Sequence, residues 1–377
     1  MRKILPDSSL AGGIGYDHSA AKRGICAQAG NGGQAMAGRE IAMTRDRLET
    51  GLARALAAAA RVVLACGVLA CGVLACGVTA QAQVAIRVGK AQAQNFAFMA
   101  ADVGVAAGIF KTHGIDLEIA NFGGDARLVQ ALSANAIAFA LGGGPTIAFE
   151  VKGAPMLAVA AMADRPRTIM MVVAKDGPGK SEDDLKGRTV SVSTTGSLTY
   201  WLAQELSRSH GWGSDGIKIA PLGTTTAQAA ALKTRQIDGV VTESSTVLRL
   251  VEEGTGRILV RFGDRIPDFH VHVIFARKGL VDGNPEAVRK FLAAWFESVQ
   301  YMRDHRDETI AIAMRVAEVS KSVATANYDE LMPVFNRNGR FDAKALDVLA
   351  RSFVEMGALP EKPDMSKLYT EAFLPKN

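Results

Sequence analysis

Two successive series of short apolar strands and helices constrain the fold of this chain most strongly. From Val84 onward, apolar stretches of strand length alternate with amphipathic stretches of helical length, and the connections between them are short. The alternation restarts near Leu185 and continues to Ala276, and the sequence is typical of helices from Pro285 onward. Such alternation predicts, in each half, a mainly parallel sheet flanked by helices. We therefore expect an α/β fold of two lobes with a cleft between them and a helical C-terminal region.

The expected strands and helices follow from apolar periodicity and from the Gly, Pro and polar residues that separate the periodic segments. Strands are expected at 84–89, 115–120, 137–141, 156–161, 168–174, 189–193, 217–221, 237–242, 258–262 and 271–276. Helices are expected at 96–113, 125–134, 146–152, 196–210, 226–235 and 244–253, and from 285 onward. The apolar face of the helix that begins at 285 consists of Val288, Phe291, Leu292, Trp295 and Val299.

An uninterrupted run of 18 apolar and small residues, Val62–Thr79, lies near the start of the sequence. Arginines precede it, and Ala80-Gln81-Ala82 follows it with the small residues that a signal peptidase requires. We interpret residues 43–82 as a Sec-type signal peptide, which places the mature protein in the periplasm. Residues 1–42 are interpreted as a disordered or untranslated prefix, with translation from Met43.

Two other interpretations of the apolar run stay open. Its length is just sufficient to span a bilayer, so an uncleaved membrane anchor is one alternative. The segment Val73-Leu-Ala-Cys76 has some likeness to a lipidation site, so a lipid-anchored form is the other. The small residues directly after the run favour the cleaved signal peptide over both.

Charge and cysteine are unevenly distributed, and this excludes several classes of function. The formal net charge is +5, but residues 1–83 hold nine Lys and Arg and only five Asp and Glu, so the remaining chain is near neutral. A near-neutral body gives no reason to expect a nucleic-acid partner. All four cysteines precede residue 84, namely Cys26, Cys66, Cys71 and Cys76. The body therefore has neither disulfides nor thiol chemistry.

The motifs that would indicate catalysis or metal binding are incomplete. Gly177-Pro-Gly-Lys-Ser181 ends like a phosphate-binding loop, but Ala174 occupies the position where that loop requires glycine. His270 and His272 are two residues apart, with no third metal ligand nearby in the sequence. No serine lies in a Gly-x-Ser-x-Gly motif. We expect no catalytic residue, no metal and no cofactor.

Small and polar residues follow several expected strands at the points where helices begin. In open α/β sheets, ligands bind outside the carboxyl ends of the strands. Glycine lets the backbone approach a ligand, and a helix N-terminus has unpaired N–H groups. The expected ligand-binding residues are Gln92, Gln94, Asn95, Gly143, Gly144, Thr146, Ser193, Thr194, Thr195, Gly196, Ser197, Thr225, Glu243 and His270.

The turn from Ser193 to Ser197 is the part of this set for which we expect the strongest contact. Hydroxyl residues there surround Gly196 at the start of a helix, and a helix N-terminus attracts negative charge. We expect the turn to bind the most polar end of a ligand. The alternative is that it only caps the helix.

The order of several segments resembles type II periplasmic solute-binding proteins of ABC importers, in the nitrate/sulfonate/taurine (SsuA/THI5-like) group. The resemblance covers roughly residues 84–370. In the first half it rests on GIFKTHGIDLEIANFGGDARLVQAL, FALGGGPTIAFE and LAVAAMADRP. In the second half it rests on DDLKGRTVSVSTTGSLTYWLAQELSRSHGW, LGTTTAQAAALKTRQIDGVVTESSTV and NPEAVRKFLAAWFESVQYMRDHRDE.

The resemblance implies a chain that starts in lobe one, crosses to lobe two and returns. It places lobe one at 83–174, lobe two at 175–272, and the return segment with the C-terminal helices at 273–377. The two crossings are expected near Ala174–Pro178 and His270–Ala276. The lobes would close on a ligand like a hinged clamp.

The resemblance also implies a function and partners. The protein would be a monomeric, non-enzymatic solute-binding component that captures a small, anionic organic solute, sulfonate-, taurine- or nitrate-like, for a membrane ABC permease. Where sulfonate and nitrate binders often have an acidic-aromatic or Asp-Pro element, this chain has Thr242-Glu243-Ser244. Arg165 is the one cation that the sequence suggests for an anion.

Two alternatives are a ligand-sensing module and an enzyme of small-molecule metabolism with the same fold. A fungal thiamine-pyrimidine synthase of this fold uses a Cys-rich iron site, and the body of this chain has no cysteine. Menaquinone-pathway enzymes of this fold work in the cytoplasm, whereas an export leader is expected here. Neither a signalling domain nor a second apolar span follows the body.

Overall fold

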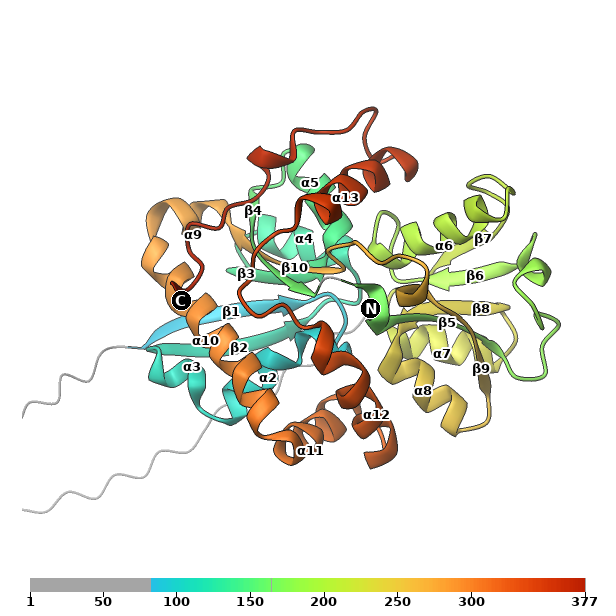
Figure 1. Ribbon diagram of the computed structural model, residues 1–377, viewed down its shortest axis with the longest axis horizontal. Coiled ribbons are helices and arrows are strands. Elements are labelled where there is room, and N and C mark those ends of the chain that lie inside the picture. Colours follow the sequence, from blue (N-terminus) through green and yellow to red (C-terminus); the bar gives the residue numbers. More distant parts are fainter. Residues whose placement is uncertain (1–82, 164, 377) are drawn as a thin grey trace, which may run out of the picture. The chain divides into compact units, whose positions relative to one another are not determined.

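Two five-stranded sheets organise the chain in the computed structural model, which describes residues 83–163 and 165–376 (Figure 1). The first sheet has the strand order β2-β1-β3-β10-β4, and the second has the order β7-β6-β8-β5-β9. We call the first sheet and its helices lobe one, and the second sheet and its helices lobe two. The expected signal peptide and prefix lie outside the described residues.

The strands of the first sheet are β1 (Val84–Lys90), β2 (Ile115–Asn121), β3 (Phe139–Gly143), β4 (Met156–Ala163) and β10 (His272–Arg277). Those of the second are β5 (Ile169–Ala174), β6 (Thr189–Val192), β7 (Lys218–Pro221), β8 (Gly239–Glu243) and β9 (Gly256–Arg261). The first seven α-helices are α2 (Met99–Ala106), α3 (Ile109–Thr112), α4 (Asp125–Ser133), α5 (Ile147–Val151), α6 (Leu198–Ser209), α7 (Thr225–Lys233) and α8 (Ser244–Glu252). The C-terminal region adds α9 (Lys278–Gly283), α10 (Pro285–Asp304), α11 (Arg306–Ala317), α12 (Lys321–Leu331) and α13 (Ala343–Glu355).

The expected order of strands and helices is confirmed, with end points that differ by a few residues. One expected helix, 96–113, is instead a 3-10 turn (Phe96–Phe98) followed by α2 and α3. The break between α2 and α3 lies at Gly108, whose φ is 75°. Glycine adopts this left-handed conformation without the steric cost that other residues pay, so Gly108 ends one helix and starts the next.

The prediction of mainly parallel sheets is confirmed, with one reversed strand in each sheet. In the first sheet, β1 pairs parallel with β2 and β3, whereas β10 pairs antiparallel with β3 and β4. In the second, β6 pairs parallel with β7 and β8, whereas β5 pairs antiparallel with β8 and β9. The reversed strands are the first strand after each crossing between the lobes.

The expected position of the first crossing was wrong. The sequence pattern assigned 168–174 to lobe one, but β5 lies in the second sheet between β8 and β9. The chain therefore crosses between Ala163 and Ile169, before β5 rather than after it. The return crossing also lies earlier than expected, between Asp264 and His272, because His272 already belongs to the first sheet. Two adjacent apolar strands do not reveal from their residues which partners they hydrogen-bond.

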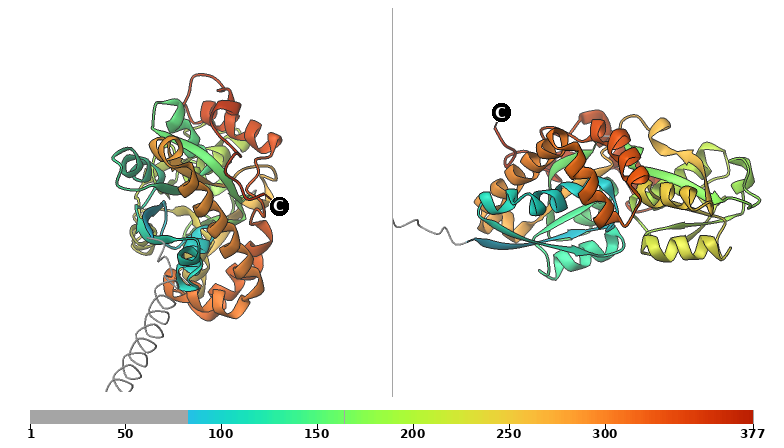
Figure 2. Two further views of the ribbon diagram at one scale, coloured as in Figure 1. Left: turned by 90° about the vertical axis from the view of Figure 1, so that its left-hand side faces the viewer. Right: turned by 90° about the horizontal axis from the view of Figure 1, so that it is seen from below.

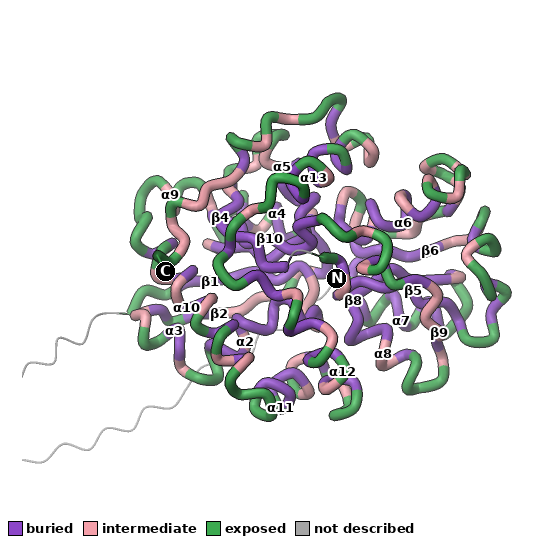
Figure 3. Tube along the Cα trace, viewed as in Figure 1, coloured by how far each residue is buried: buried purple, intermediate pink, exposed green. Residues whose placement is uncertain are grey.

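The second sheet is covered on both faces because its strand residues alternate in direction. Met170 and Val172 of β5 pack in one hydrophobic cluster with Leu232 of α7 and Leu250 of α8. Met171 belongs to the other cluster, which includes α6. Successive strand residues point to opposite faces, so one apolar run serves both layers. Figure 3 shows β5 and β8, in the middle of this sheet, as buried along their length.

Helix α10 covers one face of the first sheet, and α4 lies on the other face (Figure 2). Phe291 of α10 stacks on Phe139 of β3, with ring centroids 3.8 Å apart. On the opposite face, Leu128 of α4 packs against Gly89 of β1, where a Cβ would lie only 2.5 Å from its Cδ1 atom. The apolar face expected for α10 is confirmed as buried.

Within residues 83–163 and 165–376, no helix has the length and apolar character needed to cross a membrane.

Glu150 of α5 gives a testable pH dependence of stability. Its Oε2 atom is buried without a hydrogen-bond partner in the described part of the chain. This burial raises the pKa of Glu150 to about 8, although Lys278 partly opposes the shift. A glutamate in the unfolded chain titrates near pH 4.3. The folded protein therefore binds more protons than the unfolded chain between these two values, and its stability falls as the pH rises through this window.

Replacing Glu150 with glutamine removes this titration. We expect Glu150→Gln to match the wild-type melting temperature near about pH 4.5 and to exceed it increasingly up to about pH 8, where the difference levels off. Melting temperatures measured across this range by differential scanning calorimetry test the prediction. A difference that is the same at all pH values would contradict it.

Candidate functional site

A small cavity lies between the two lobes, at the carboxyl ends of β1, β3, β6 and β8. Its volume is about 30 Å³, which is room for on the order of two water molecules. The residues that line it are Ala91, Gln92, Asn95, Phe98, Asp125, Gly143, Ile169, Ser193, Leu198, Thr199, Gln228, Val241, Thr242, Glu243 and His272. Both lobes contribute, and the strand ends where they meet are the usual ligand position in α/β sheets.

Five of the residues expected from the sequence to bind a ligand line this cavity: Gln92, Asn95, Gly143, Ser193 and Glu243. They come from four different strand ends, two in each lobe. The sequence therefore identified the edge of each sheet at which the cavity forms. Contact between these five residues and a ligand stays a prediction.

Several expected residues join the lobes to each other, including Gln92, which also lines the cavity. The Oε1 atom of Gln94 accepts hydrogen bonds from Thr225 Oγ1 at 2.9 Å and from Thr246 Oγ1 at 3.2 Å. The Nε2 atom of Gln92 donates to the carbonyl oxygen of Gly223 at 3.1 Å. Thr194 Oγ1 accepts from the backbone N–H of residue 126 at 3.5 Å. These contacts hold the lobes together around the cavity.

The turn from Ser193 to Ser197 uses most of its hydroxyl groups internally. The Oγ atom of Ser193 lies 3.0 Å from Ser197 Oγ and 3.1 Å from Thr199 Oγ1. Ser197 also caps α6 by accepting from the backbone N–H of residue 200. Thr195 is exposed, and neither it nor Gly196 lines the cavity. Of this turn, only Ser193 lines the cavity, whereas Ser197 caps α6 and Thr194 contacts lobe one.

Gly144, Thr146 and His270 lie behind the cavity wall, contrary to expectation. His270 is outside β10, and its Nε2 atom accepts from the backbone N–H of Asp342 at 2.7 Å. Gly144 packs against the backbone of His270, and Thr146 Oγ1 donates to Asp125 Oδ1 at 2.9 Å. All three therefore lie outside the cavity lining, and contact between them and a ligand stays a prediction. His270 precedes β10, which begins at His272, so the two rings are not neighbours on one strand.

His272 lines the cavity and was not among the expected ligand residues. Its Nε2 atom accepts a hydrogen bond from Asn95 Nδ2 at 3.0 Å, and its ring lies edge-on to Phe98. Burial lowers the pKa of His272 to about 3, so the ring is neutral and its proton is on Nδ1. Among the described residues, Nδ1 has no hydrogen-bond partner.

Two buried carboxyl groups, one from each lobe, line the cavity. Asp125, in the first turn of α4, accepts at Oδ1 from the N–H of Gly143 at 2.8 Å. Glu243, which directly precedes α8, accepts at Oε2 from Thr242 Oγ1 at 2.8 Å and at Oε1 from Thr246 Oγ1. Burial raises the pKa of each carboxyl group, and these hydrogen bonds oppose the rise. The sequence analysis identified Glu243 but treated Asp125 only as the start of a helix.

Gln228 of α7 is a further lining residue that the sequence analysis missed. It is 1% exposed, and neither its Nε2 nor its Oε1 atom has a hydrogen-bond partner in the part of the chain that the structure describes. A buried amide that lacks partners costs free energy, which a ligand would recover. The local sequence does not distinguish a glutamine that is buried in a cavity wall from an exposed glutamine of an ordinary helix.

The lining contains no lysine or arginine among the described residues. Arg165, the cation suggested by the sequence, is exposed and does not line the cavity. No group of three or more His, Cys, Asp or Glu side chains in the described ranges is placed to hold a metal ion. The cavity lining therefore offers an anion no positively charged side chain.

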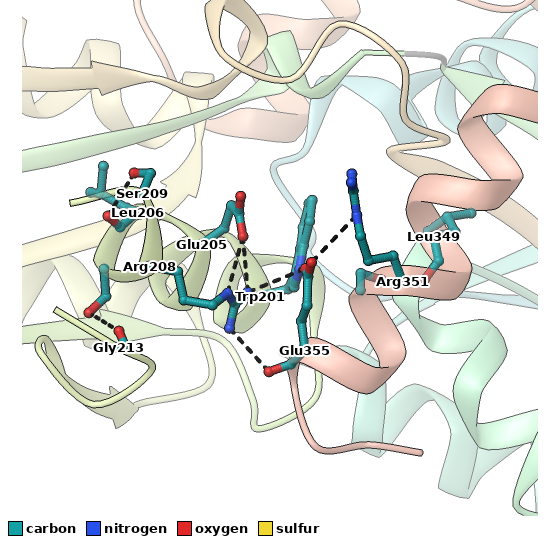
Figure 4. A network of polar contacts seen from close by, with 11 residues as sticks. Trp201, Glu205, Leu206, Arg208, Ser209, Gly213, Leu349, Arg351 and Glu355 are labelled. Carbon is teal, nitrogen blue, oxygen red and sulfur yellow. Dashed lines mark hydrogen bonds and ion pairs between the residues drawn. The ribbon is translucent and has the colours of Figure 1, made fainter. Parts of the chain in front are cut away.

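A second set of contacts between the lobes surrounds Glu355 at the end of α13 (Figure 4). Trp201 Nε1 of α6 donates to Glu355 Oε2 at 3.1 Å, and Arg208 Nη1 donates to the Glu355 carbonyl oxygen at 3.1 Å. Arg351 Nε lies 3.4 Å from Glu355 Oε1. Helix α13 packs on lobe one near Gly144, so this cluster links lobe two to lobe one outside the cavity.

We expect Glu355→Ala to open the lobes without unfolding them. Loss of a hydrogen bond to a charged group costs about 1.5–3 kcal/mol when buried, and less here because the Glu355 side chain is 25% exposed. Trp201 should become hydrated, so its fluorescence should shift to the red and become easier to quench with acrylamide. The exposed Glu361, changed to alanine, is the control. Unchanged emission in Glu355→Ala would contradict the role of this cluster.

Comparison with known families adds sequence relationships to this geometry. The family model described as "NMT1/THI5 like" matches residues 95–309. A protein of Brucella abortus named as a binding protein is 26% identical over 220 residues, which is 57% of this chain and 66% of the relative. The chain thus spans just under two thirds of the length of that relative.

Solved structures share the fold. The alkanesulfonate-binding protein SsuA of Xanthomonas axonopodis, bound to MOPS, superposes with a TM-score of 0.67 at 16% identity, covering 76% of this chain and 98% of that one. The periplasmic aliphatic sulphonate-binding protein SsuA of Escherichia coli gives 0.63 at 20% identity, covering 76% and 92%. The desulfurization enzyme DszB gives 0.58 at 16% identity, covering 77% and 97%. The two-lobed periplasmic-binding-protein fold expected from the sequence is confirmed.

Proposed function

This chain belongs to the NMT1/THI5-like family, and we propose from that premise that it is the solute-binding component of an ABC importer. It would capture a small polar solute between its lobes and deliver it to a membrane permease. Export by the signal peptide expected at residues 43–82 would place it in the periplasm, where it would act as a monomer.

One observation carries the proposal: a cavity with buried polar groups is lined by both lobes, and the described part of the chain crosses between the lobes at two places. The strand crossings at 163–169 and 264–272 are the covalent links about which the lobes can rotate. Lining residues from the two lobes can meet a solute together only when the lobes are closed. Binding therefore favours the closed form, which is how a ligand shifts a two-state equilibrium.

An enzyme is the second candidate, because the desulfurization enzyme DszB has the same fold. A cysteine nucleophile is excluded for residues 83–377, which contain no cysteine. Within the described ranges, no serine of the cavity lining hydrogen-bonds to a histidine: His272 bonds to Asn95, and Ser193 bonds to other hydroxyl groups. These contacts support binding without turnover.

The test is to incubate the purified protein with a bacterial small-molecule extract, wash it, and identify the released compounds by mass spectrometry. We expect one unchanged compound in a one-to-one ratio with the chain. Prolonged incubation should form no product, and small-angle scattering should show a smaller radius of gyration with the compound bound. Steady conversion of the compound would instead establish an enzyme.

A further inference from the structure

We propose that the cavity binds its solute through a positively charged group rich in N–H donors, such as a primary ammonium, and that it rejects oxyanions. This inference rests on the solute-binding function proposed above and names the chemical class of the solute.

The two carboxyl groups lie on opposite lobes, Asp125 on lobe one and Glu243 on lobe two, and both line the cavity. Asp125 is 4% exposed and Glu243 is 2% exposed. Burial disfavours the ionised form of each carboxyl group. A cation in the cavity would favour the ionised form of both groups, and because the two groups belong to different lobes this would favour the closed form.

Each of the two carboxyl groups accepts hydrogen bonds from its neighbours in the protein. Asp125 accepts from Gly143 and Thr146, and Glu243 accepts from Thr242 and Thr246. Each carboxyl group also lies at the N-terminal end of a helix, where negative charge is favourable. The structure therefore supports the ionised form of both groups once a counter-charge is present.

No cation of the protein is available to supply that charge within the described residues of the lining. Lys90 is the nearest in the sequence to a lining residue, but its Nζ atom lies 2.8 Å from Asp102 Oδ2, with the lysine side chain 1% exposed. An oxyanion would meet two buried carboxyl groups, and Arg249 of α8, which lowers the pKa of Glu243, does not line the cavity. The oxyanion would also displace acidic groups from the two helix N-termini that an anion would otherwise use.

Gln228 and His272 independently indicate that the cavity is incomplete without a ligand. Both are at least 98% buried, both line the cavity, and the described residues leave the Gln228 amide atoms and the His272 Nδ1 atom without partners. Gln228 Oε1 can accept from a further N–H of the solute. His272 Nδ1–H and Gln228 Nε2 can donate to a neutral oxygen, such as a hydroxyl or carbonyl group.

The test uses ethylamine and ethanesulfonate, which share a carbon chain and differ in the charged head group. Thermal shift and isothermal titration calorimetry are measured on the wild type with each probe, with sodium chloride as the control for ionic strength. We expect ethylamine to raise the melting temperature and ethanesulfonate to leave it unchanged. Stabilisation by ethanesulfonate, or by neither probe, would overturn the inference.

The variants Asp125→Asn and Glu243→Gln keep the size of each side chain and remove its charge. Each is expected to weaken ethylamine binding by more than about tenfold. Glu118→Gln is the matched control, because the Glu118 side chain is 71% exposed and remote from the cavity lining. Equal ethylamine affinity in all three variants would overturn the inference.

The outcomes separate this inference from the proposed function. Tight binding of ethanesulfonate without conversion keeps the solute-binding function and rejects the ammonium assignment. Conversion of a bound compound into a product would reject the proposed solute-binding function, whatever the head group of that compound.

Discussion

Gly143→Val is expected to abolish solute binding while the protein stays folded. Gly143 ends β3 in lobe one, and a Cβ atom there would lie 2.9 Å from Leu198 Cβ of α6 in lobe two. Its φ of −71° and ψ of 152° suit any residue, so valine strains no backbone at this position. The added side chain acts between the lobes rather than within one of them. It should keep the lobes from closing around the cavity.

We expect affinity for the native solute to fall by more than about tenfold, which is more than about 1.4 kcal/mol. Small-angle scattering should show that added solute no longer compacts the variant. Gly283→Val is the control, since nothing lies within 4 Å of a Cβ placed at Gly283. Wild-type affinity of the Gly143→Val variant would show that Gly143 and Leu198 do not approach each other when the solute is bound.

Gly144→Ala, one residue further along, is expected to destabilise the fold itself. A Cβ atom at Gly144 would lie 2.0 Å from the carbonyl oxygen of His270 and 2.7 Å from Leu349 Cδ2. The first of these is a backbone atom, and it is held in place because the N–H of residue 144 donates to the carbonyl oxygen of residue 271. The chain around the return crossing must therefore shift to admit one methyl group.

Overpacking of this kind costs on the order of 3 kcal/mol. In a protein of this size that loss should lower the melting temperature by several degrees. Urea denaturation of Gly144→Ala beside Gly283→Ala measures the cost, and the second variant should change little. A wild-type midpoint for Gly144→Ala would show that the return crossing is looser than the structure indicates.

The neighbouring glycines illustrate a limit of sequence analysis. Both follow an apolar strand, and both were expected to let the backbone approach a ligand. Gly143 faces the other lobe across the cavity, whereas Gly144 packs against the backbone next to β10. Their roles differ because of what lies opposite each one, and those neighbours are more than fifty residues away in the sequence.

The two histidines differ for a related reason. His270 and His272 are equivalent in the sequence, but β10 begins only at His272. Its pairing with Gly143 brings that ring to the cavity, where it meets Asn95. His270 lies before the strand and binds the backbone at Asp342. Because the strand pairing of β10 begins at His272, the ring of His272 and not that of His270 lies at the cavity.

The charge of the cavity was hidden from the sequence as well. The body of the chain is near neutral, and Asp125 follows a strand end as an ordinary first-turn residue of a helix. Only the approach of the two lobes puts it into one cavity with Glu243. The family resemblance implied an anionic solute without considering these two carboxyl groups. The measurements with ethylamine and ethanesulfonate distinguish that expectation from the ammonium group proposed here.

The sequence by itself determined the order and the approximate ends of the strands and helices, because apolar periodicity is a local property of each segment. It also determined that small and polar residues collect at the carboxyl ends of the strands. The tertiary structure decided that β5 belongs to lobe two, which glycine and which histidine face the cavity, and that two carboxyl groups meet there. Each of these depends on hydrogen bonds or packing between residues distant in the chain, and no local pattern encodes such pairing.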